Sequence, residues 1–350
     1  MNTDVPSPRR APTLEHVARA AGVSRATVSR VINGVRNVDP EIADVVQRAI
    51  AATGYVPNRA ARALVTRRTF SVALVVSAPD DVAFADPFLG RAFADPFFGR
   101  VASGALAELA DRDMHMILMR VNDEPARAEL LGQLRHGDID GVLSIPVAGT
   151  DPLPRMLTEA RVPVVLFGRP ADSLAISHVD AAQHAGAAMA ADHLVGRGCR
   201  RVATICGPAD TPAGADRLTG FRTAMARHGR AYVPAVEGNF THDGGESAML
   251  ALLRQDPDFD GLFVANDLMA QGAMLVLRDA GRRVPEDIAV VGFDDSVVAL
   301  STRPKLTTIR QPVEEMAAAM VRLLLTHIED RGRPVASVIF DPTLVIRDSA

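Results

Sequence analysis

The chain has 350 residues, of which 48% are apolar and 4% aromatic, so it is long enough for two or three folded domains. Its two cysteines, Cys199 and Cys206, exclude a disulfide framework, and no run of about 18 apolar residues predicts a membrane span. The first residues lack the apolar run of a signal peptide, so we expect a cytoplasmic protein with no membrane partner.

The net charge of −4 is unevenly distributed along the chain. Residues 1–68 contain 11 Arg, no Lys and five acidic residues, a net charge of +6, so residues 69–350 carry −10. Arg and Lys neutralise phosphates and supply most of the non-specific affinity for DNA. The first segment is therefore a candidate for contact with a polyanion, although a solvated Arg-rich tail would have the same charge.

Residues 13–53 predict three short helices. The first follows Thr13 as a cap and stops at Gly22, which tolerates a positive φ. The second starts at Ser24, and the third starts after Asp39, with proline and an acid in its first turn. The expected buried faces consist of Leu14, Val17, Ala18 and Ala21, then Val28, Val31 and Ile32, then Ile42, Val45, Val46, Ala49 and Ile50.

Two helices joined at a glycine and supported by a third form a helix-turn-helix, whose second helix enters the major groove of DNA. In this geometry Arg25, Ala26 and Arg30 face base edges, since arginine can bond guanine and alanine can contact a thymine methyl. A generic three-helix bundle is the alternative. The remaining expected contacts, mostly with phosphate, are Thr13, Ser24, Thr27, Ser29 and Asn33.

The runs Thr13 to Gly34 and Gly54 to Asn58 resemble the LacI/GalR (lac-repressor) family of transcriptional regulators. By this resemblance the segment from Asn58 to Leu64 is a hinge helix that pairs with its copy in a second subunit, in the minor groove. Leu64 would then be a wedge between base pairs, with Asn58 and Ala61 among the DNA contacts. So short a helix is marginal alone, so we expect it to fold only on DNA. The alternative is a plain linker.

Beyond Phe70, short apolar runs alternate with stretches of helical period, which is typical of parallel sheets covered by helices on both faces. The number of units indicates two similar lobes. The predicted strands are 70–77, 115–121, 141–145, 163–167, 202–206, 261–265 and 288–293, and the predicted helices are 97–113, 125–136, 183–197, 214–228, 244–255 and 267–281.

A nine-residue segment is repeated in tandem between Ala83 and Arg100. The second copy predicts a helix start, with Asp95 as N-cap and Pro96 at the first helical position. We expect the first copy to form an extended loop at the mouth of a cleft. The duplication leaves open which copy faces that cleft.

The segment beyond residue 69 also resembles the family's two-lobed sensor domain, through motifs such as Asp95 to Phe98 and Val291 to Asp295. The implied fold is an N-terminal all-α helix-turn-helix head with a hinge helix, followed by a two-lobed α/β periplasmic-binding-protein-like sensor domain with parallel sheets. The implied effector contacts are Arg217, Phe240, Asn266 and Asp294 in the C-terminal lobe and Phe98 in the N-terminal lobe. Polar residues that follow strands suit a ligand site in such folds. The alternatives are interlobe or loop salt bridges and, for Phe240, core packing.

Two departures from the family pattern put N-terminal-lobe contacts in doubt. Ala182 and Gln183 stand where many members have an Asp-Asn pair, and Gly168 and Arg169 stand where some carry an acid. Arg169 is a candidate donor to an anionic group of the effector, with a plain surface arginine as the alternative.

The resemblance implies four segments. Residues 12–56 form the head, and residues 57–68 form the hinge helix and linker. The N-terminal lobe comprises 69–180 and 309–333, and the C-terminal lobe comprises 181–308 and 334–350. Few residues follow the expected last strand, Pro342 to Arg347, so we expect a homodimer without a tetramerising tail and a pseudo-palindromic double-stranded operator.

An enzyme and a transport-type sugar-binding protein are the rival classes. The chain lacks the common nucleotide-binding, serine-hydrolase and zinc-protease motifs, so we expect no enzyme, no cofactor and no metal. Asp256 to Gly261 begins like an EF-hand loop, but the following residues predict a strand. We therefore expect a repressor controlled by a small-molecule effector between the lobes. Release from DNA by a sugar inducer is favoured, and a regulator that needs a corepressor is the alternative.

Overall fold

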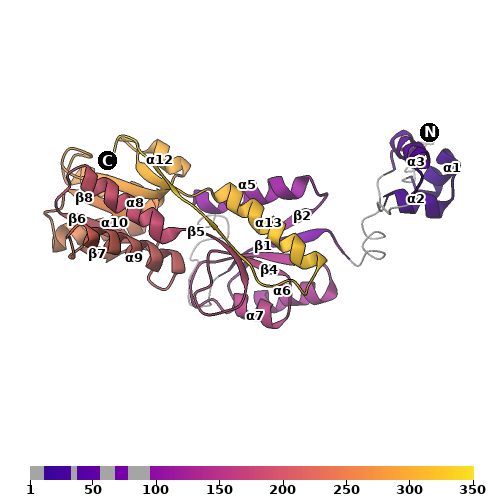
Figure 1. The fold of residues 1–350 in the computed structure, drawn as a ribbon, viewed down its shortest axis with the longest axis horizontal. Coiled ribbons are helices and arrows are strands. Elements are labelled where there is room, and N and C mark those ends of the chain that lie inside the picture. The colour runs from indigo at the N-terminus through magenta and orange to yellow at the C-terminus, as the bar shows by residue number, and fades with distance from the viewer. Residues whose placement is uncertain (1–11, 33–37, 56–67, 78–94) are drawn as a thin grey trace, which may run out of the picture. The chain divides into compact units, whose positions relative to one another are not determined.

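The computed structural model describes residues 12–32, 38–55, 68–77 and 95–350. They belong to two compact units, Met1–Thr69 and Phe70–Ala350 (Figure 1). No helix in these described ranges is long and apolar enough to cross a membrane.

The first unit is a three-helix head made of α1 (Leu14–Ala21), α2 (Arg25–Ile32) and α3 (Pro40–Thr53). Val17, Val28 and Val46, one from each helix, are fully buried in its core. Helix α1 ends at Gly22, whose φ of 67° lies in the left-handed region that glycine tolerates. The three predicted helices are confirmed, but Ile42 is 38% exposed and does not belong to the core.

The second unit contains two six-stranded sheets. In the first sheet the order is β11-β5-β4-β3-β1-β2, and all neighbouring strands are parallel. These strands are β1 (Ser71–Ser77), β2 (His115–Val121), β3 (Gly141–Pro146), β4 (Val164–Phe167), β5 (Ser177–Ala181) and β11 (Ser337–Phe340).

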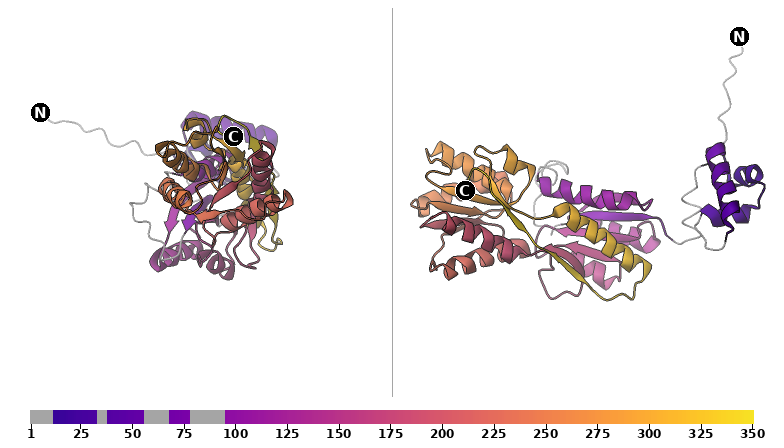
Figure 2. Two further views of the ribbon diagram at one scale, coloured as in Figure 1. Left: turned by 90° about the vertical axis from the view of Figure 1, so that its left-hand side faces the viewer. Right: turned by 45° about the horizontal axis from the view of Figure 1, so that its top comes forward.

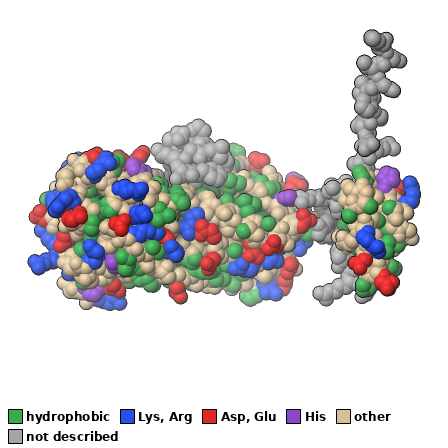
Figure 3. All heavy atoms as spheres, turned by 90° about the horizontal axis from the view of Figure 1, so that it is seen from above, with side chains coloured by type: hydrophobic (Ala, Val, Ile, Leu, Met, Phe, Trp, Pro, Cys, Tyr) green, Lys and Arg blue, Asp and Glu red, His purple; other side chains and the backbone are tan. Residues whose placement is uncertain are grey.

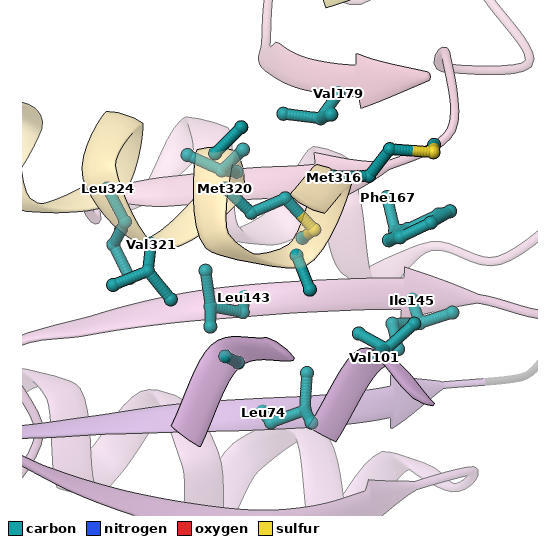
Figure 4. Close-up of a cluster of buried hydrophobic side chains, with 14 of the residues drawn as sticks. Leu74, Val101, Leu143, Ile145, Phe167, Val179, Met316, Met320, Val321 and Leu324 are labelled. Carbon is teal, nitrogen blue, oxygen red and sulfur yellow. The ribbon is translucent and has the colours of Figure 1, made fainter. Parts of the chain in front are cut away.

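Helices cover both faces of the first sheet, and side chains of β1 alternate between the two resulting cores. Helices α5 (Pro96–Ala110) and α13 (Val313–Glu329) cover one face, and α6 (Glu124–His136) and α7 (Leu153–Glu159) cover the other. Figure 4 shows apolar side chains of α13, among them Met320 and Leu324, directed onto the strands. We call this sheet with its four helices the first lobe.

The second sheet has the order β12-β10-β9-β8-β6-β7, parallel except for β12. Helices α8 and α9 pack on one face and α10 and α11 on the other, so this second lobe is also a three-layer sandwich (Figure 2). Its elements are β6 (Val202–Cys206), β7 (Ala235–Glu237), β8 (Gly261–Val264), β9 (Ala289–Asp294), β10 (Thr307–Arg310), β12 (Thr343–Val345), α8 (Gln183–Gly196), α9 (Pro212–Arg227), α10 (His242–Gln255), α11 (Asp267–Asp279) and the short α12 (Val297–Ser301).

The chain passes between the lobes three times: after β5, after β10 and after β11. The predicted assignment of residues to the two lobes differs from the observed course of the chain in two places. Residues 334–350 were expected in the C-terminal lobe, but β11 pairs in parallel with β5 of the first sheet, and β10 of the second sheet extends to Arg310. A short strand has the same local pattern in either sheet, so periodicity could not show which edge it joins.

Acidic and basic side chains are interspersed over the face of the Phe70–Ala350 unit drawn in Figure 3. The start of the EF-hand-like segment follows this pattern, since Asp256 and Asp258 pair with Arg201. In the described part of the chain no group of three or more His, Cys, Asp or Glu side chains could hold a metal ion.

Candidate effector and DNA sites

Four of the expected effector residues lie near the carboxyl ends of the strands in the second sheet. Asp294 ends β9, Asn266 follows β8 as the N-cap of α11, and Arg217 belongs to α9, which follows β6. Phe240 precedes α10. The carboxyl ends of parallel strands meet at one edge of the sheet, so the fold brings these residues together.

Arg217 is 5% exposed, and its guanidinium is held from several sides. Nε donates to Gln183 Oε1 at 2.8 Å, and Nη1 donates to the Ala265 carbonyl at 2.5 Å. The guanidinium carbon lies 3.7 Å from the centroid of the Phe293 ring. Burial lowers the pKa of Arg217, although the carboxylate of Asp294 opposes this change. An arginine fixed in this way can present its remaining donors in one direction.

Asp294 lies 3.6 Å from Arg217, measured from Oδ1 to Nη1, and its Oδ1 also accepts a 2.6 Å hydrogen bond from Gln311 Nε2. Burial raises the pKa of Asp294 to about 7, although Arg217 opposes the rise. Asp294 has a φ of 109°, and Phe240 has a φ of 63°. Such conformations cost about 1–3 kcal/mol in non-glycine residues and cluster at functional sites.

Asn266 positions Phe240 as well as the helix it caps. Its Oδ1 accepts from the Met269 N–H at 2.9 Å, while its Nδ2 donates to the Phe240 carbonyl at 2.9 Å. A Cβ on Gly207 would lie 2.2 Å from Cζ of Phe240, so the ring depends on a glycine beneath it. The Asn266 amide retains one N–H and one lone pair with which to contact a ligand.

The first lobe contributes residues that the sequence analysis did not select for the effector site. Asp95 caps α5 through a 2.9 Å bond from the Phe97 N–H, which confirms the predicted helix start. Burial raises the pKa of Asp95, and its charge interacts with that of Arg217. Arg100, also in α5, donates to the Asp294 carbonyl at 2.9 Å. The sequence around Asp95 and Arg100 could not predict these contacts, because their partners lie about 120 to 200 residues away in the chain. From local sequence alone, the two residues are indistinguishable from a helix cap and a surface arginine.

Gln183, which belongs to the Ala182-Gln183 pair that departs from the family pattern, lies in the candidate effector site. It is buried, accepts from Arg217 Nε and donates through Nε2 to Asp180 Oδ1 at 2.9 Å. The departure from the family pattern therefore lies directly beside Arg217.

Phe98 and Arg169 are placed differently from the second-lobe residues. Phe98 is half-buried and packs edge-on against Phe97, with 5.4 Å between the ring centroids, beside the first-lobe core. Arg169 forms a salt bridge with Asp216 of α9 and is 41% exposed at the side chain. Arg169 is therefore more than the plain surface arginine that was its alternative to effector contact, because it pairs with a carboxylate of the other lobe.

In the head, the expected base-reading residues share the exposed surface of α2. Arg25, Ala26 and Arg30 are exposed, whereas Val28 on the opposite side is fully buried. Ser24 caps α2, since its Oγ accepts from the Thr27 N–H at 3.1 Å. Arg25 is near Glu15, but the 3.8 Å pair is about 70% exposed on both sides and is weak in water. The arginine side chain can therefore turn toward DNA.

The other expected DNA contacts fall into two groups. Thr13 and Ser24 are exposed, and Thr27 and Ser29 are half-buried on the same helix-turn-helix. Asn33, Asn58, Ala61 and Leu64 lie outside the described residues, as does the first copy of the nine-residue repeat.

A helix-turn-helix head joined to a two-lobed α/β domain defines a ligand-responsive DNA-binding regulator. Comparison with known families matches residues 13–58 to the bacterial regulatory proteins of the lacI family and residues 191–350 to the periplasmic binding protein-like domain. The chain belongs to the lacI family of bacterial regulatory proteins. It is a DNA-binding transcriptional regulator and not an enzyme.

Two relatives and one solved structure cover almost the whole chain. The HTH-type transcriptional regulator CelR of Thermobifida fusca is 44% identical over 345 residues, which span 97% of this chain and 99% of CelR. The HTH-type transcriptional regulator GalR of Escherichia coli (strain K12) is 33% identical over 96% of this chain and 95% of GalR. The structure of a transcriptional regulator CelR-cellobiose complex matches with a TM-score of 0.74 at 41% identity, covering 97% of this chain and all of that chain.

Proposed function

We propose that this regulator is a repressor whose effector is a sugar, and that cellobiose is the first sugar to test. The observation that carries the proposal is the buried contact of Arg217 with Asp294 at the carboxyl edge of the second sheet. A donor fork beside paired acceptors suits vicinal hydroxyl groups, and the half-buried Phe240 ring suits the C–H face of a sugar. CelR, whose solved complex contains cellobiose, is similar along nearly its whole length.

We assign effector contact to Arg217, Phe240, Asn266 and Asp294, with Asp95 and Phe98 approaching from the first lobe. The four second-lobe residues come from separate loops and helices and converge at one edge, which supports their acting as a set. Both oxygens of Asp294 are available to hydroxyl donors when it is ionised, although one also accepts from Gln311.

In the head we assign base reading to Arg25, Ala26 and Arg30, and backbone or minor-groove contact to the other expected residues. The proposed head spans 12–56, and the proposed hinge segment spans 57–68. A homodimer in the cytoplasm acting on a pseudo-palindromic operator follows from the family relationship. The remaining assigned DNA contacts are Thr13, Ser24, Thr27, Ser29, Asn33, Asn58, Ala61 and Leu64.

Selection of genomic fragments by the purified full chain, with and without cellobiose, glucose, galactose or ribose, tests both parts of the proposal. We expect one palindromic sequence to be enriched and to be released by cellobiose. Enrichment only in the presence of a sugar would instead identify a corepressor. No enrichment under any condition would contradict sequence-specific reading, and enrichment that no sugar alters would contradict the effector class.

A pair of variants then locates the site. Arg217→Gln should keep operator binding but lose the response to sugar, because the buried fork is removed. Arg278→Gln is the matched control, since Arg278 is also in the second lobe but has a side chain that is 72% exposed. An unchanged sugar response in Arg217→Gln would place the effector site elsewhere.

A further inference from the structure

Arg169 and Asp216 join the two lobes. Arg169 follows β4 of the first lobe, and Asp216 lies in α9 of the second. Arg169 Nε donates to Asp216 Oδ2 at 2.7 Å, and Nη2 donates to Oδ1 at 2.8 Å. Two parallel hydrogen bonds between planar groups fix both the separation and the relative orientation of their backbones.

Both ends of this pair are anchored within their own lobes. The Arg169 N–H donates to Asp180 Oδ2 at 3.0 Å, which holds the loop after β4 against β5. The Asp216 side chain is 14% exposed, and His184 Nε2 of the same lobe lies 3.3 Å from its Oδ1. Burial tends to raise the pKa of Asp216, but Arg169 outweighs burial and the pKa is lowered. Moving the lobes apart would therefore break the pair before it distorted the loop after β4 or helix α9.

A second contact lies at the same interlobe edge. Gly149 in the loop after β3 approaches the loop after β6 so closely that a Cβ there would lie 1.9 Å from the Asp210 carbonyl oxygen. Gly149 and Arg169 line one surface pocket together with Thr211, the N-cap of α9. The two lobes are thus in contact at this edge through backbone as well as through the ion pair.

The pair is coupled to the proposed effector site by its position in α9. Asp216 binds Arg169, and the next residue, Arg217, contacts Asp294 and Gln183. Arg169 Nη1 also donates, to the Pro170 carbonyl at 3.3 Å, so each guanidinium nitrogen has a protein acceptor. Three of the five N–H donors of Arg169 therefore have protein acceptors, and two of these bonds go to Asp216, so in this arrangement Arg169 holds α9.

We propose that the Arg169–Asp216 pair is an interlobe latch that favours the arrangement in which the two lobes meet at this edge, and thereby sets effector affinity. The latch itself does not depend on the identity of the effector; its consequence for sugar affinity rests on the proposed function. A partly exposed ion pair changes an equilibrium by only a few fold, so loss of the latch should weaken effector binding about two- to fivefold.

Distances across the lobes in the sugar-free full chain test the latch directly. Spin labels are placed at Glu159→Cys at the end of α7 and at Tyr232→Cys beyond α9, both exposed, while Cys199 and Cys206 are buried. Arg169→Ala and Asp216→Ala should each shift the distance distribution to longer values. The exchanged pair Arg169→Asp with Asp216→Arg should restore the original distribution.

The matched control is Arg155→Ala, because Arg155 pairs with Asp172 inside the first lobe and lines the same pocket. It should leave the distances unchanged. Unchanged distances in Arg169→Ala, or an equal shift in Arg155→Ala, would overturn the latch.

Calorimetric titration with cellobiose separates a latch from a ligand contact. A latch predicts a rise in Kd of about two- to fivefold for each single variant and no further rise for the double variant, since either change already breaks the pair. Complete loss of binding in Arg169→Ala with unchanged distances would make Arg169 a direct ligand and overturn the proposal. If the wild-type chain does not bind cellobiose, the effector assignment fails while the distance measurement still decides the latch.

Discussion

Replacing Asp294 with Asn would separate the cost of burying this carboxylate from its use in binding. The residue is 7% exposed, and burial raises its pKa from 3.8 to about 7, although Arg217 opposes the rise. Between these pH values the folded chain keeps a proton that the unfolded chain has lost. The stability contributed by this group therefore falls as the pH rises from about 4 to 7 and is constant above that.

The size of the effect follows from the two pKa values. One pKa unit corresponds to about 1.4 kcal/mol, so the cost of ionising Asp294 is about 4 kcal/mol at pH 8 and about 1 to 2 kcal/mol at pH 5. Asn cannot ionise, and its amide oxygen can still accept from Gln311. Relative to wild type, Asp294→Asn should gain about 2 to 3 kcal/mol between pH 5 and pH 8, which is roughly 5 °C in Tm.

Thermal unfolding of the full chain between pH 5 and pH 8 measures this difference. Asp279→Asn is the control, since its side chain is 66% exposed on α11, and its Tm should follow wild type at every pH. Cellobiose affinity at pH 7.5 should fall at least tenfold in Asp294→Asn, because a charged acceptor is lost. A Tm difference that does not depend on pH, or one that shrinks as the pH rises, would refute the reasoning.

Three further substitutions test the head and the support of the aromatic ring. Arg25→Ala should relax base preference at one operator position by about 1–3 kcal/mol, measured by competition among operator variants; equal loss on all sequences would contradict base reading. Gly22→Ala should destabilise the head by about 1 kcal/mol, because φ is 67°, and hydrogen exchange of α1 and α2 should become about fivefold faster. Unchanged exchange rates would contradict this prediction. Gly207→Ala should displace the Phe240 ring and weaken cellobiose binding about tenfold, and calorimetry showing wild-type affinity would count against a ring contact.

Local signals in the sequence determined most of the secondary structure. Asp39 and Asp95 cap helices where predicted, and each of the seven strands predicted beyond residue 69 has an observed counterpart. Helix α13 is absent from the predicted elements. Its buried residues, among them Met316, Met320 and Leu324, recur every three or four positions, so the local sequence does carry a helical period there. The predicted elements also omit several short ones, since so few residues carry little periodicity: the strands β5, β7, β10 and β11 and the helices α7 and α12.

The sequence by itself determined the family, the two kinds of domain and the residues that end the strands of the second sheet. Only the tertiary structure decided which side chains meet. Arg169 pairs with Asp216, 47 positions later, and Arg100 reaches the Asp294 carbonyl, 194 positions later. Such partners have no common period or spacing, because they are brought together by the packing of two lobes that the chain crosses three times. For that reason the sequence could name Arg169 as a candidate effector contact but could not show that its guanidinium already binds a carboxylate of the other lobe.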